Sequence, residues 1–210
     1  ISVFDWKIYQ HLFSAAEMEA VFAETNSIAC WIEVERATAR AQAKVSIIPE
    51  NAAREIDEKL CIEALDLDQL QASTRKVGRP IIGLIEQLKQ QVSAEAGEWV
   101  HFGVTTYDIM DTGRSLQLRK GLSLIEDSLT RFQDRLSELA EIHKVTPMIG
   151  RTNNLHAQPI SFGAKIAAWI EETARHKDRL KALKSRALTI QFGGAIGTLA
   201  SLQNLSLIHI

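Results

Sequence analysis

The chain has 210 residues, of which 46% are hydrophobic and 24% are charged, proportions that exclude a disordered, collagen-like or mucin-like protein. The formal net charge of −2 provides no basic excess for nucleic acid, and two cysteines exclude a disulfide framework. No apolar run reaches the roughly 18 residues of a membrane span, and no signal sequence opens the chain, so we expect a cytoplasmic protein that binds neither membranes nor nucleic acid.

Apolar residues recur at spacings of three and four, and prolines and glycines are few, which predicts an all-α fold. The capping-box pattern of residues 14–17 predicts a first helix to about Glu24. Further helices are expected over residues 27–44, 49–60 and 80–92, with a short helix or turn at 66–70. Small residues at 93–98 predict a loop and a domain boundary.

Two long helices are expected after this boundary, one over residues 107–143 and one that begins after Pro159 and runs to about Ile190. Their apolar residues alternate at spacings of four and three, which is the pattern of a coiled-coil seam. The seam residues are Leu118, Leu122, Ile125, Leu129, Phe132, Leu136 and Leu139, then Phe162, Ile166, Trp169, Thr173, His176, Leu180, Leu183 and Ala187. Such seams need partner helices, which predicts a long-helix bundle built from several copies of the chain.

A polar segment, residues 99–108, marks the start of the first long helix. Unpaired backbone N–H groups and the positive end of the helix dipole favour an anion at such a position. Thr105 or Thr106 could therefore offer a hydroxyl to a carboxylate. The alternative is an ordinary helix cap, with Asp108 in the first turn and His101 packed in the loop.

A second polar segment, residues 150–159, precedes the second long helix. Arg151 could bind a carboxylate through two parallel hydrogen bonds, and His156 could transfer a proton near neutral pH. The alternative is an interhelix loop with a surface arginine and histidine. No ligand spacing suggests a metal site and no nucleotide-binding fingerprint occurs, so neither a metal nor a cofactor is expected.

The two segments resemble signature regions of the fumarase/aspartase superfamily of lyases and cycloisomerases. Residues 101–108 read HFGVTTYD, similar to its H-x-G-x-T-S-x-D stretch, and residues 150–159 read GRTNNLHAQP, similar to its G-R-T-H-x-x-x-A-x-P stretch. Within the superfamily the chain is most similar to 3-carboxy-cis,cis-muconate cycloisomerase and to adenylosuccinate-lyase-like proteins. The resemblance implies a homotetramer with a helical core, and active sites assembled from three subunits.

The same resemblance implies the chemistry: a proton leaves the carbon next to a carboxylate, and the substituent on the neighbouring carbon then departs, without a cofactor or metal. The substrate would be a small anionic carboxylate. The residues that the resemblance places in substrate binding are His101, Thr105, Thr106, Asp108, Arg151, Thr152 and Asn153. Among them, Asp108 matches the aspartate that supports the first signature loop.

Two departures from the superfamily pattern bear on the reaction. The usual histidine of the second motif is Asn153 here, and an amide cannot act as a general acid. Residues 74–80 also lack the histidine that adenylosuccinate lyases carry in that region. Muconate cycloisomerases dispense with the first histidine and keep one at the position of His156. His156 is therefore the predicted catalytic residue, and a cycloisomerase-like activity is favoured over adenylosuccinate cleavage.

The superfamily's catalytic serine lies on a G-S-S-x-M-P-x-K-x-N-P loop that does not occur in this sequence. We therefore expect the chain to be an N-terminal half that is inactive alone. The expected organisation is a helical domain at 1–97, the first part of the bundle domain at 98–204, and an artefactual tail at 205–210. The alternatives are an adenylosuccinate-lyase-like C–N lyase and a non-catalytic helical oligomerisation module.

Overall fold

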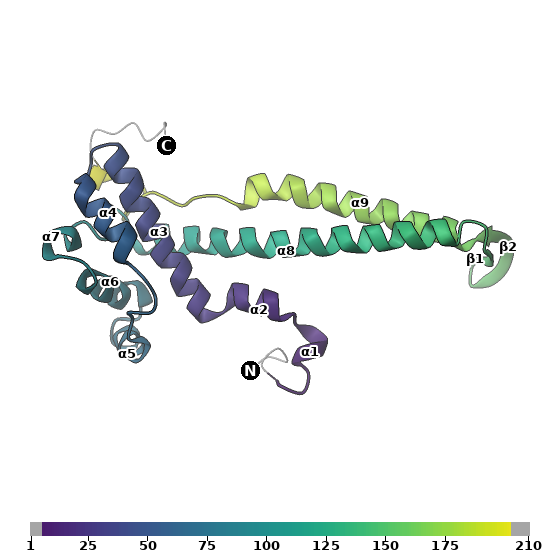
Figure 1. Cartoon of the computed structure of the whole chain (residues 1–210), viewed down its shortest axis with the longest axis horizontal. Coiled ribbons are helices and arrows are strands. Elements are labelled where there is room, and N and C mark those ends of the chain that lie inside the picture. Colours follow the sequence, from purple (N-terminus) through teal and green to yellow (C-terminus); the bar gives the residue numbers. More distant parts are fainter. Residues whose placement is uncertain (1–5, 203–210) are drawn as a thin grey trace. The chain divides into compact units, whose positions relative to one another are not determined.

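The computed structural model describes residues 6–202, and within them the chain is predominantly helical, as predicted (Figure 1). The helices are α1 (Gln10–Phe13), α2 (Ala16–Phe22), α3 (Glu24–Lys44), α4 (Glu50–Lys59), α5 (Leu67–Val77), α6 (Pro80–Gln90), α7 (Ala94–Gly97), α8 (Thr106–Ile142), α9 (Phe162–Ala187) and the short 3₁₀ helix η2 (Ala200–Leu202). Strands β1 (Pro147–Thr152) and β2 (Leu155–Ser161) form an antiparallel hairpin. None of the described helices is both long enough and apolar enough to cross a membrane.

The chain divides into two compact units. The first comprises the described residues of Ile1–Leu118 and Thr189–Ile210, and the second comprises Arg119–Leu188. This division by contacts does not test the predicted domain boundary after residue 97, which stays a prediction. The predicted artefactual tail, 205–210, lies outside the described residues.

The hydrophobic core of the first unit lies among α3, α4, α6 and the start of α8. Its fully buried members include Ile28, Ile32, Ile56, Leu60, Ile81, Leu84, Leu88, Val100 and Ile109. Gly113 lets α8 approach α3 closely, because a Cβ atom at this position would lie 2.7 Å from Cδ1 of Trp31. Burial of this apolar surface is the main stabilising contribution to the first unit.

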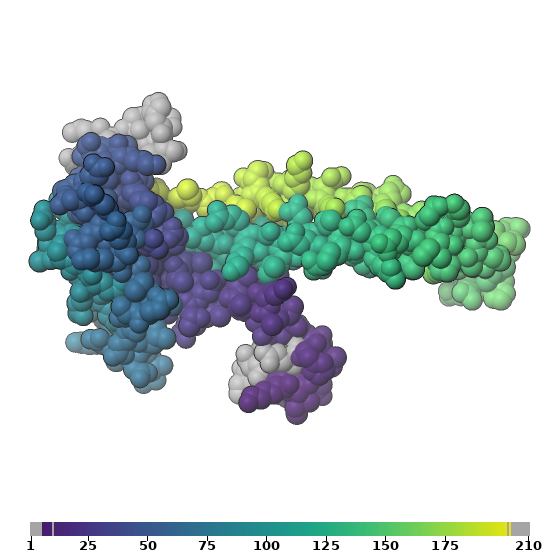
Figure 2. All heavy atoms as spheres, viewed as in Figure 1, coloured from purple at the N-terminus to yellow at the C-terminus, as the bar shows by residue number. Residues whose placement is uncertain are grey.

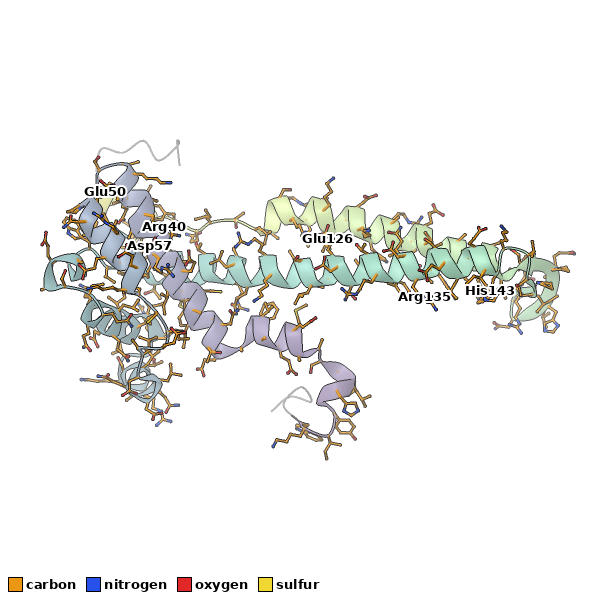
Figure 3. All side chains as sticks on the ribbon, in the orientation of Figure 1. Arg40, Glu50, Asp57, Glu126, Arg135 and His143 are labelled. Carbon is orange, nitrogen blue, oxygen red and sulfur yellow. The ribbon has the colours of Figure 1, made fainter. Side chains whose placement is uncertain are left out.

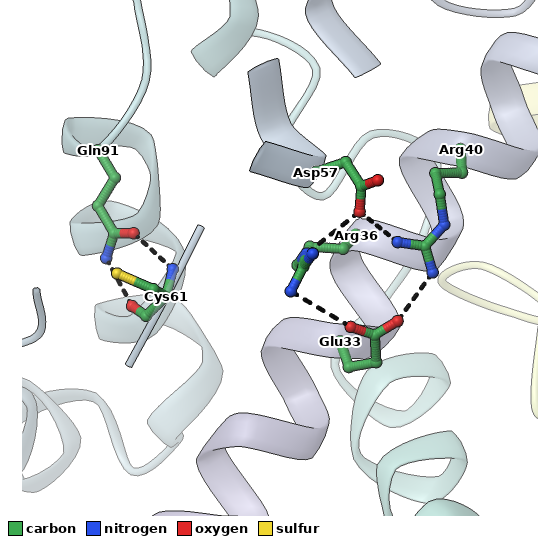
Figure 4. A network of polar contacts seen from close by, with 6 residues as sticks. All are labelled: Glu33, Arg36, Arg40, Asp57, Cys61 and Gln91. Atoms are coloured by element: carbon green, nitrogen blue, oxygen red, sulfur yellow. Dashed lines mark hydrogen bonds and ion pairs between the residues drawn. The ribbon is translucent and has the colours of Figure 1, made fainter. Parts of the chain in front are cut away.

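Two glutamines, Gln87 on α6 and Gln91 directly after its last residue, hold the connection between α4 and α5. Gln91 accepts a hydrogen bond from the backbone N–H of Cys61 (2.9 Å) and donates one to its carbonyl (3.1 Å), as Figure 4 shows. One turn earlier, Gln87 makes the same paired contact with the backbone of Asp66 (2.8 and 3.0 Å). The side-chain amides thereby pair both backbone groups of Cys61 and the N–H of Asp66, and give the Asp66 carbonyl a second donor besides the N–H of Leu70.

Ion pairs join α3 to α4 beside this connection (Figure 4). Asp57 on α4 accepts a hydrogen bond from Nε of Arg36 at 3.2 Å and a further bond from Arg40. Glu33 contacts both arginines from their own helix. These side chains are about one-third to one-half exposed, so the network adds little to the free energy of unfolding and mainly orients the two helices.

Three local predictions in the first unit are corrected by the structure. The capping box at residues 14–17 is wrong: Ala15 precedes α2 without a side-chain cap, and the Ser14 hydroxyl donates to Glu19 instead. Helix α5 runs on to Val77 because Asp66 caps its start and Gly78, at φ 78°, ends it. The predicted loop at 93–98 contains α7, which Ser93 caps.

The second unit contains an antiparallel helix pair formed by α8 and α9. Lys177 donates to Gln133 across the pair at 3.1 Å, and Lys184 pairs with Glu126, which Figure 3 labels on α8. The Lys184 ammonium lowers the pKa of the Glu126 carboxyl, chiefly through this hydrogen bond. Figure 2 shows the atoms of the two helices in contact within this unit.

Each predicted seam separates into two rows of residues spaced seven apart. One row is buried or half-buried within the helix pair: Leu122, Leu129, Leu136, Ile166, Thr173 and Leu180. The other row includes Ile125, Phe132, Trp169 and Leu183, which are 40–53% exposed and are called the exposed seam row here; Leu118, Leu139 and Phe162 at the same spacing are half-buried. A single copy of the chain therefore leaves the four apolar side chains of the exposed seam row largely uncovered in this unit.

Glu55 is expected to make the first unit less stable in acid. Its Oε1 accepts from Nζ of Lys59 (2.7 Å) and from the backbone N–H of Ser93 (2.8 Å), and its Oε2 accepts from the Ser93 hydroxyl (2.8 Å). These bonds, with the Lys59 bond the largest cause, lower the pKa of the carboxyl from 4.5 to about 2. Because the pKa is lower in the folded chain, the stabilisation is complete above the unfolded value and is lost as the pH falls toward 2.

Urea unfolding at about pH 5 and about pH 2 measures this effect. The unfolding midpoint of Glu55→Gln should fall less over this interval than that of the wild type. Glu58→Gln, the same change at an exposed position of α4, is the matched control and should follow the wild type. Equal pH dependence in all three proteins would contradict the assignment.

Candidate functional site

The first signature segment forms a loop that α3 holds in place. His101 and Gly103 both have positive φ (64° and 72°), a conformation that few residues other than glycine adopt. Glu35 contacts Nδ1 of His101 at 2.6 Å, and Nε2 of Gln42 donates to the carbonyl of Phe102 at 2.7 Å. Both α3 side chains are 3% exposed, so the loop rests on buried polar contacts.

Asp108 is a buried carboxylate whose oxygens accept backbone hydrogen bonds. Oδ2 accepts from the N–H of Thr105 (3.0 Å) and of Gly194 (2.9 Å), and Oδ1 accepts from the N–H of Gly193 (2.9 Å). The bond to Thr105 is one half of a capping box at the start of α8. Asp108 thus joins the loop, the helix and the returning chain, in agreement with the predicted loop-supporting role, whereas its contact with substrate stays a prediction.

Two hydroxyl groups further along α8 also form hydrogen bonds with the returning chain. Thr112 donates to the carbonyl of Gln191 and accepts from its N–H, both at 3.0 Å, and Ser115 donates to the carbonyl of Thr189 at 2.6 Å. The three side chains at 108, 112 and 115 lie on one face of the helix, because their spacing is four and three. They fix an extended segment, residues 189–194, against the first three turns of α8.

The hydroxyls of Thr105 and Thr106 remain available to a ligand. Both side chains are half-buried, and neither hydroxyl has a hydrogen-bond partner within residues 6–202. They lie at the N-terminus of a 37-residue helix, where unpaired N–H groups and the helix dipole favour negative charge. This arrangement has the electrostatics to bind a carboxylate.

The second signature segment is a β-hairpin, which corrects the predicted interhelix loop. Arg151 pairs with His156 across the strands, and Thr152 pairs with Leu155. Asn153 and Asn154 form the two-residue connection, and their φ values of 47° and 63° are those that a type I′ turn requires. Its polar, exposed residues show no apolar alternation that would indicate strands, and cross-strand backbone bonds stabilise it instead.

The hairpin turn should tolerate glycine better than alanine at residue 154. Asn154→Ala is expected to cost about 1 kcal/mol, because a residue with a Cβ atom other than Asn or Asp is strained at positive φ. Asn154→Gly keeps the conformation accessible and should stay close to the wild type. Urea unfolding followed by circular dichroism measures both; equal stabilities for the alanine and glycine variants would contradict the turn assignment.

The predicted site residues fall into two groups. His101, Thr105, Thr106 and Asp108 lie together in the first unit, and Arg151, Thr152, Asn153 and His156 lie on the exposed hairpin of the second unit. Each group is a cluster within its own unit. The catalytic role of His156 and the substrate contacts of the other seven residues stay predictions.

Sequence reasoning missed the two α3 residues that hold the first loop. The buried face of α3 runs Ile28, Ile32, Glu35, Ala39 and Gln42, at spacings of four and three. A glutamate and a glutamine therefore occupy core positions of an otherwise apolar stripe. Glutamate and glutamine side chains are rarely fully buried without a hydrogen-bond partner. Their place in this apolar stripe was the sequence signal that could have identified them.

The comparison with known proteins decides the family. The family model described as Lyase matches residues 7–205. The chain belongs to this lyase family, within the fumarase/aspartase superfamily, as the resemblance implied.

Curated relatives of this lyase family member have several activities. Trans-aconitate decarboxylase 1 of Mycosarcoma maydis is 38% identical over 91% of the chain and 39% of its own length. Adenylosuccinate lyase of Methanocaldococcus jannaschii is 36% identical over 90% of the chain and 41% of its length. 3-carboxy-cis,cis-muconate cycloisomerase of Pseudomonas aeruginosa is 39% identical over 93% of the chain and 43% of its length. The chain thus spans about two-fifths of these relatives.

Solved structures confirm the fold. The β-carboxy-cis,cis-muconate cycloisomerase of Acinetobacter calcoaceticus has a TM-score of 0.88 at 34% identity, and the match covers 94% of the chain and 47% of that protein. A fumarate lyase from Mesorhizobium has a TM-score of 0.85 at 42% identity, over 91% of the chain and 45% of that protein. The predicted all-α fold of the fumarase/aspartase type is therefore correct.

Proposed function

We propose that the chain contributes substrate-binding segments to an enzyme that acts like 3-carboxy-cis,cis-muconate cycloisomerase. The observation that carries the proposal is the start of α8, where two threonine hydroxyls with no partner in the described part of the chain lie beside a loop that Glu35, Gln42 and Asp108 hold in place. Donors fixed in advance at a site of developing negative charge are the main means of stabilising a carbanion next to a carboxylate.

The residues take distinct roles in this proposal. Thr105 and Thr106 bind one carboxylate at the start of α8, with His101 beside them. Arg151 binds a second carboxylate, and Thr152 and Asn153 flank it at the tip of the hairpin. His156 transfers a proton or binds the substrate. The reaction uses no cofactor or metal, as the superfamily resemblance implies, and the base that removes the α-proton lies outside this chain, which we therefore expect not to turn over substrate alone.

Adenylosuccinate cleavage is the second candidate, and the adenylosuccinate lyase relatives favour it. Against it stands Asn153, because an amide at the turn of the hairpin cannot protonate a leaving group. A non-catalytic helical oligomerisation module is the third candidate, for which the exposed seam row is the supporting feature.

The exposed seam row also supports assembly. Its members are large apolar side chains on a pair of long helices, and such a surface is normally covered by further helices. We propose a cytoplasmic homotetramer in which other copies cover this row and bring hairpin and loop segments of different subunits together. The proposal includes no nucleic-acid or membrane partner.

Ligand titration of the ¹⁵N-labelled 210-residue chain separates the three candidates. We expect 3-carboxy-cis,cis-muconate to shift the amide signals of Thr105, Thr106 and Arg151, and adenylosuccinate to leave them unchanged. In the double variant Thr105→Val and Thr106→Val, which removes only the hydroxyls, affinity should fall about tenfold or more. Shifts with adenylosuccinate alone would support the second candidate, and no shift with either would favour the module.

A further inference from the structure

A buried carboxylate holds one edge of the His101 ring. Oε1 of Glu35 lies 2.6 Å from Nδ1 of His101, and the Glu35 side chain is only 2% exposed. An ionised carboxylate can accept hydrogen bonds but cannot donate one. For an ionised Glu35 and a neutral ring, the contact places the imidazole proton on Nδ1 and leaves Nε2 with a lone pair.

The backbone at His101 is also held in a defined conformation. A positive φ of 64° at His101 costs about 1 kcal/mol for a residue with a Cβ atom. Conformations of this kind persist where the surroundings over-determine them. Here Gln42 supplies the second restraint, because it holds the carbonyl of Phe102 two turns further along the same face of α3.

The other edge of the ring is available. The His101 side chain is 17% exposed, and Nε2 has no partner among residues 6–202. We propose that Glu35 is a positioning residue that fixes the Nδ1–H tautomer of His101 and makes Nε2 the ring nitrogen that meets the ligand.

This inference rests on the proposed function for the identity of the ligand. Neutral His101 accepts a hydrogen bond at Nε2 from a hydroxyl or an acid O–H. When Nε2 takes a proton from water, the ring donates to a substrate carboxylate on one side and to Glu35 on the other. Glu35 therefore stabilises both the neutral ring that accepts at Nε2 and the charged ring that donates there.

The tautomer is measured directly by two-bond ¹H–¹⁵N correlation of the imidazole rings in the 210-residue chain, at about pH 8, above the ordinary pKa of histidine. We expect the signal of His101 Nδ1 to be that of a protonated nitrogen, although an unconstrained imidazole prefers the proton on Nε2. His143 is an internal reference, because its Nδ1 lies 3.2 Å from the Thr146 hydroxyl, which can donate or accept.

Three variants test whether Glu35 causes the Nδ1–H tautomer of His101. Glu35→Leu should return His101 to the Nε2–H tautomer, and Glu35→Gln, whose amide both donates and accepts, should populate both tautomers while preserving shape. Gln42→Met is the matched control: it weakens the same loop from the same helix and should leave the tautomer unchanged. If Glu35→Leu does not fold, Glu35→Gln alone decides.

Two results would overturn the inference: an Nε2–H tautomer in the wild type, or an Nδ1–H tautomer that survives both changes at Glu35. Added 3-carboxy-cis,cis-muconate should shift Nε2 more than Nδ1. A response at Thr105 and Thr106 without one at Nε2 would refute the inference and leave the proposed function standing. The expected tautomers without any response to substrate would refute the proposed function and support the positioning role of Glu35.

Discussion

Gly163→Ala is expected to destabilise the second unit by about 3 kcal/mol, in the upper range for inserting a methyl group into a packed site. The added Cβ would lie 2.6 Å from the carbonyl oxygen of Ala140 and 2.7 Å from Cα of Lys144. Both are backbone atoms at the end of α8 and just beyond it, so no side-chain rotation relieves the overlap. The N–H of Gly163 also donates to the carbonyl of His143 at 2.9 Å, and a shift of the helix would break this bond.

Urea unfolding followed by circular dichroism measures the change in the free energy of unfolding. Gly97→Ala is the matched control, because the same methyl group would have its nearest neighbour at 3.5 Å, an ordinary van der Waals contact. We expect this control to stay within about 0.5 kcal/mol of the wild type. A Gly163→Ala protein as stable as the control would show that the close approach of α8 and α9 is not needed.

Asp108→Ala is expected to cost about 3 kcal/mol in the first unit, because it removes the shared acceptor of three backbone N–H groups. Asp108→Asn should cost less, about 2 kcal/mol. Its single amide oxygen can keep the two bonds made by Oδ2, whereas its NH₂ group would face the N–H of Gly193. The order of stability is therefore wild type, then asparagine, then alanine.

Hydrogen exchange localises this effect. The amides of Gly193 and Gly194 should both exchange faster in Asp108→Ala, whereas in Asp108→Asn only that of Gly193 should, since its N–H alone loses its acceptor there. Asp111→Asn makes the same chemical change at an exposed position three residues along α8 and should alter neither stability nor exchange. Unchanged protection of both glycines in Asp108→Ala would rule out the proposed contact of residues 193–194 with α8.

The sequence by itself determined the elements whose signals are local. Helix α8 was predicted at 107–143 and runs from Thr106 to Ile142, because an unbroken apolar spacing defines a long helix and no proline lies within it. Helix α6 begins at Pro80 as expected, since proline fits the first turn. The two signature segments identified the superfamily, because the types and order of their residues can be recognised in the sequence without knowledge of the surrounding contacts.

Only the tertiary structure decided the features that join distant segments. The hairpin at 147–161 depends on cross-strand hydrogen bonds, and no alternation of apolar residues in the sequence indicates its strands. Asp108 finds two of its three donors 85 and 86 positions along the chain, and Glu35 meets His101 66 positions away. The division of each seam into a buried and an exposed row likewise depends on which face meets the other helix. Spacing along a chain specifies one face of one element, whereas a hydrogen bond between elements depends on how those elements pack.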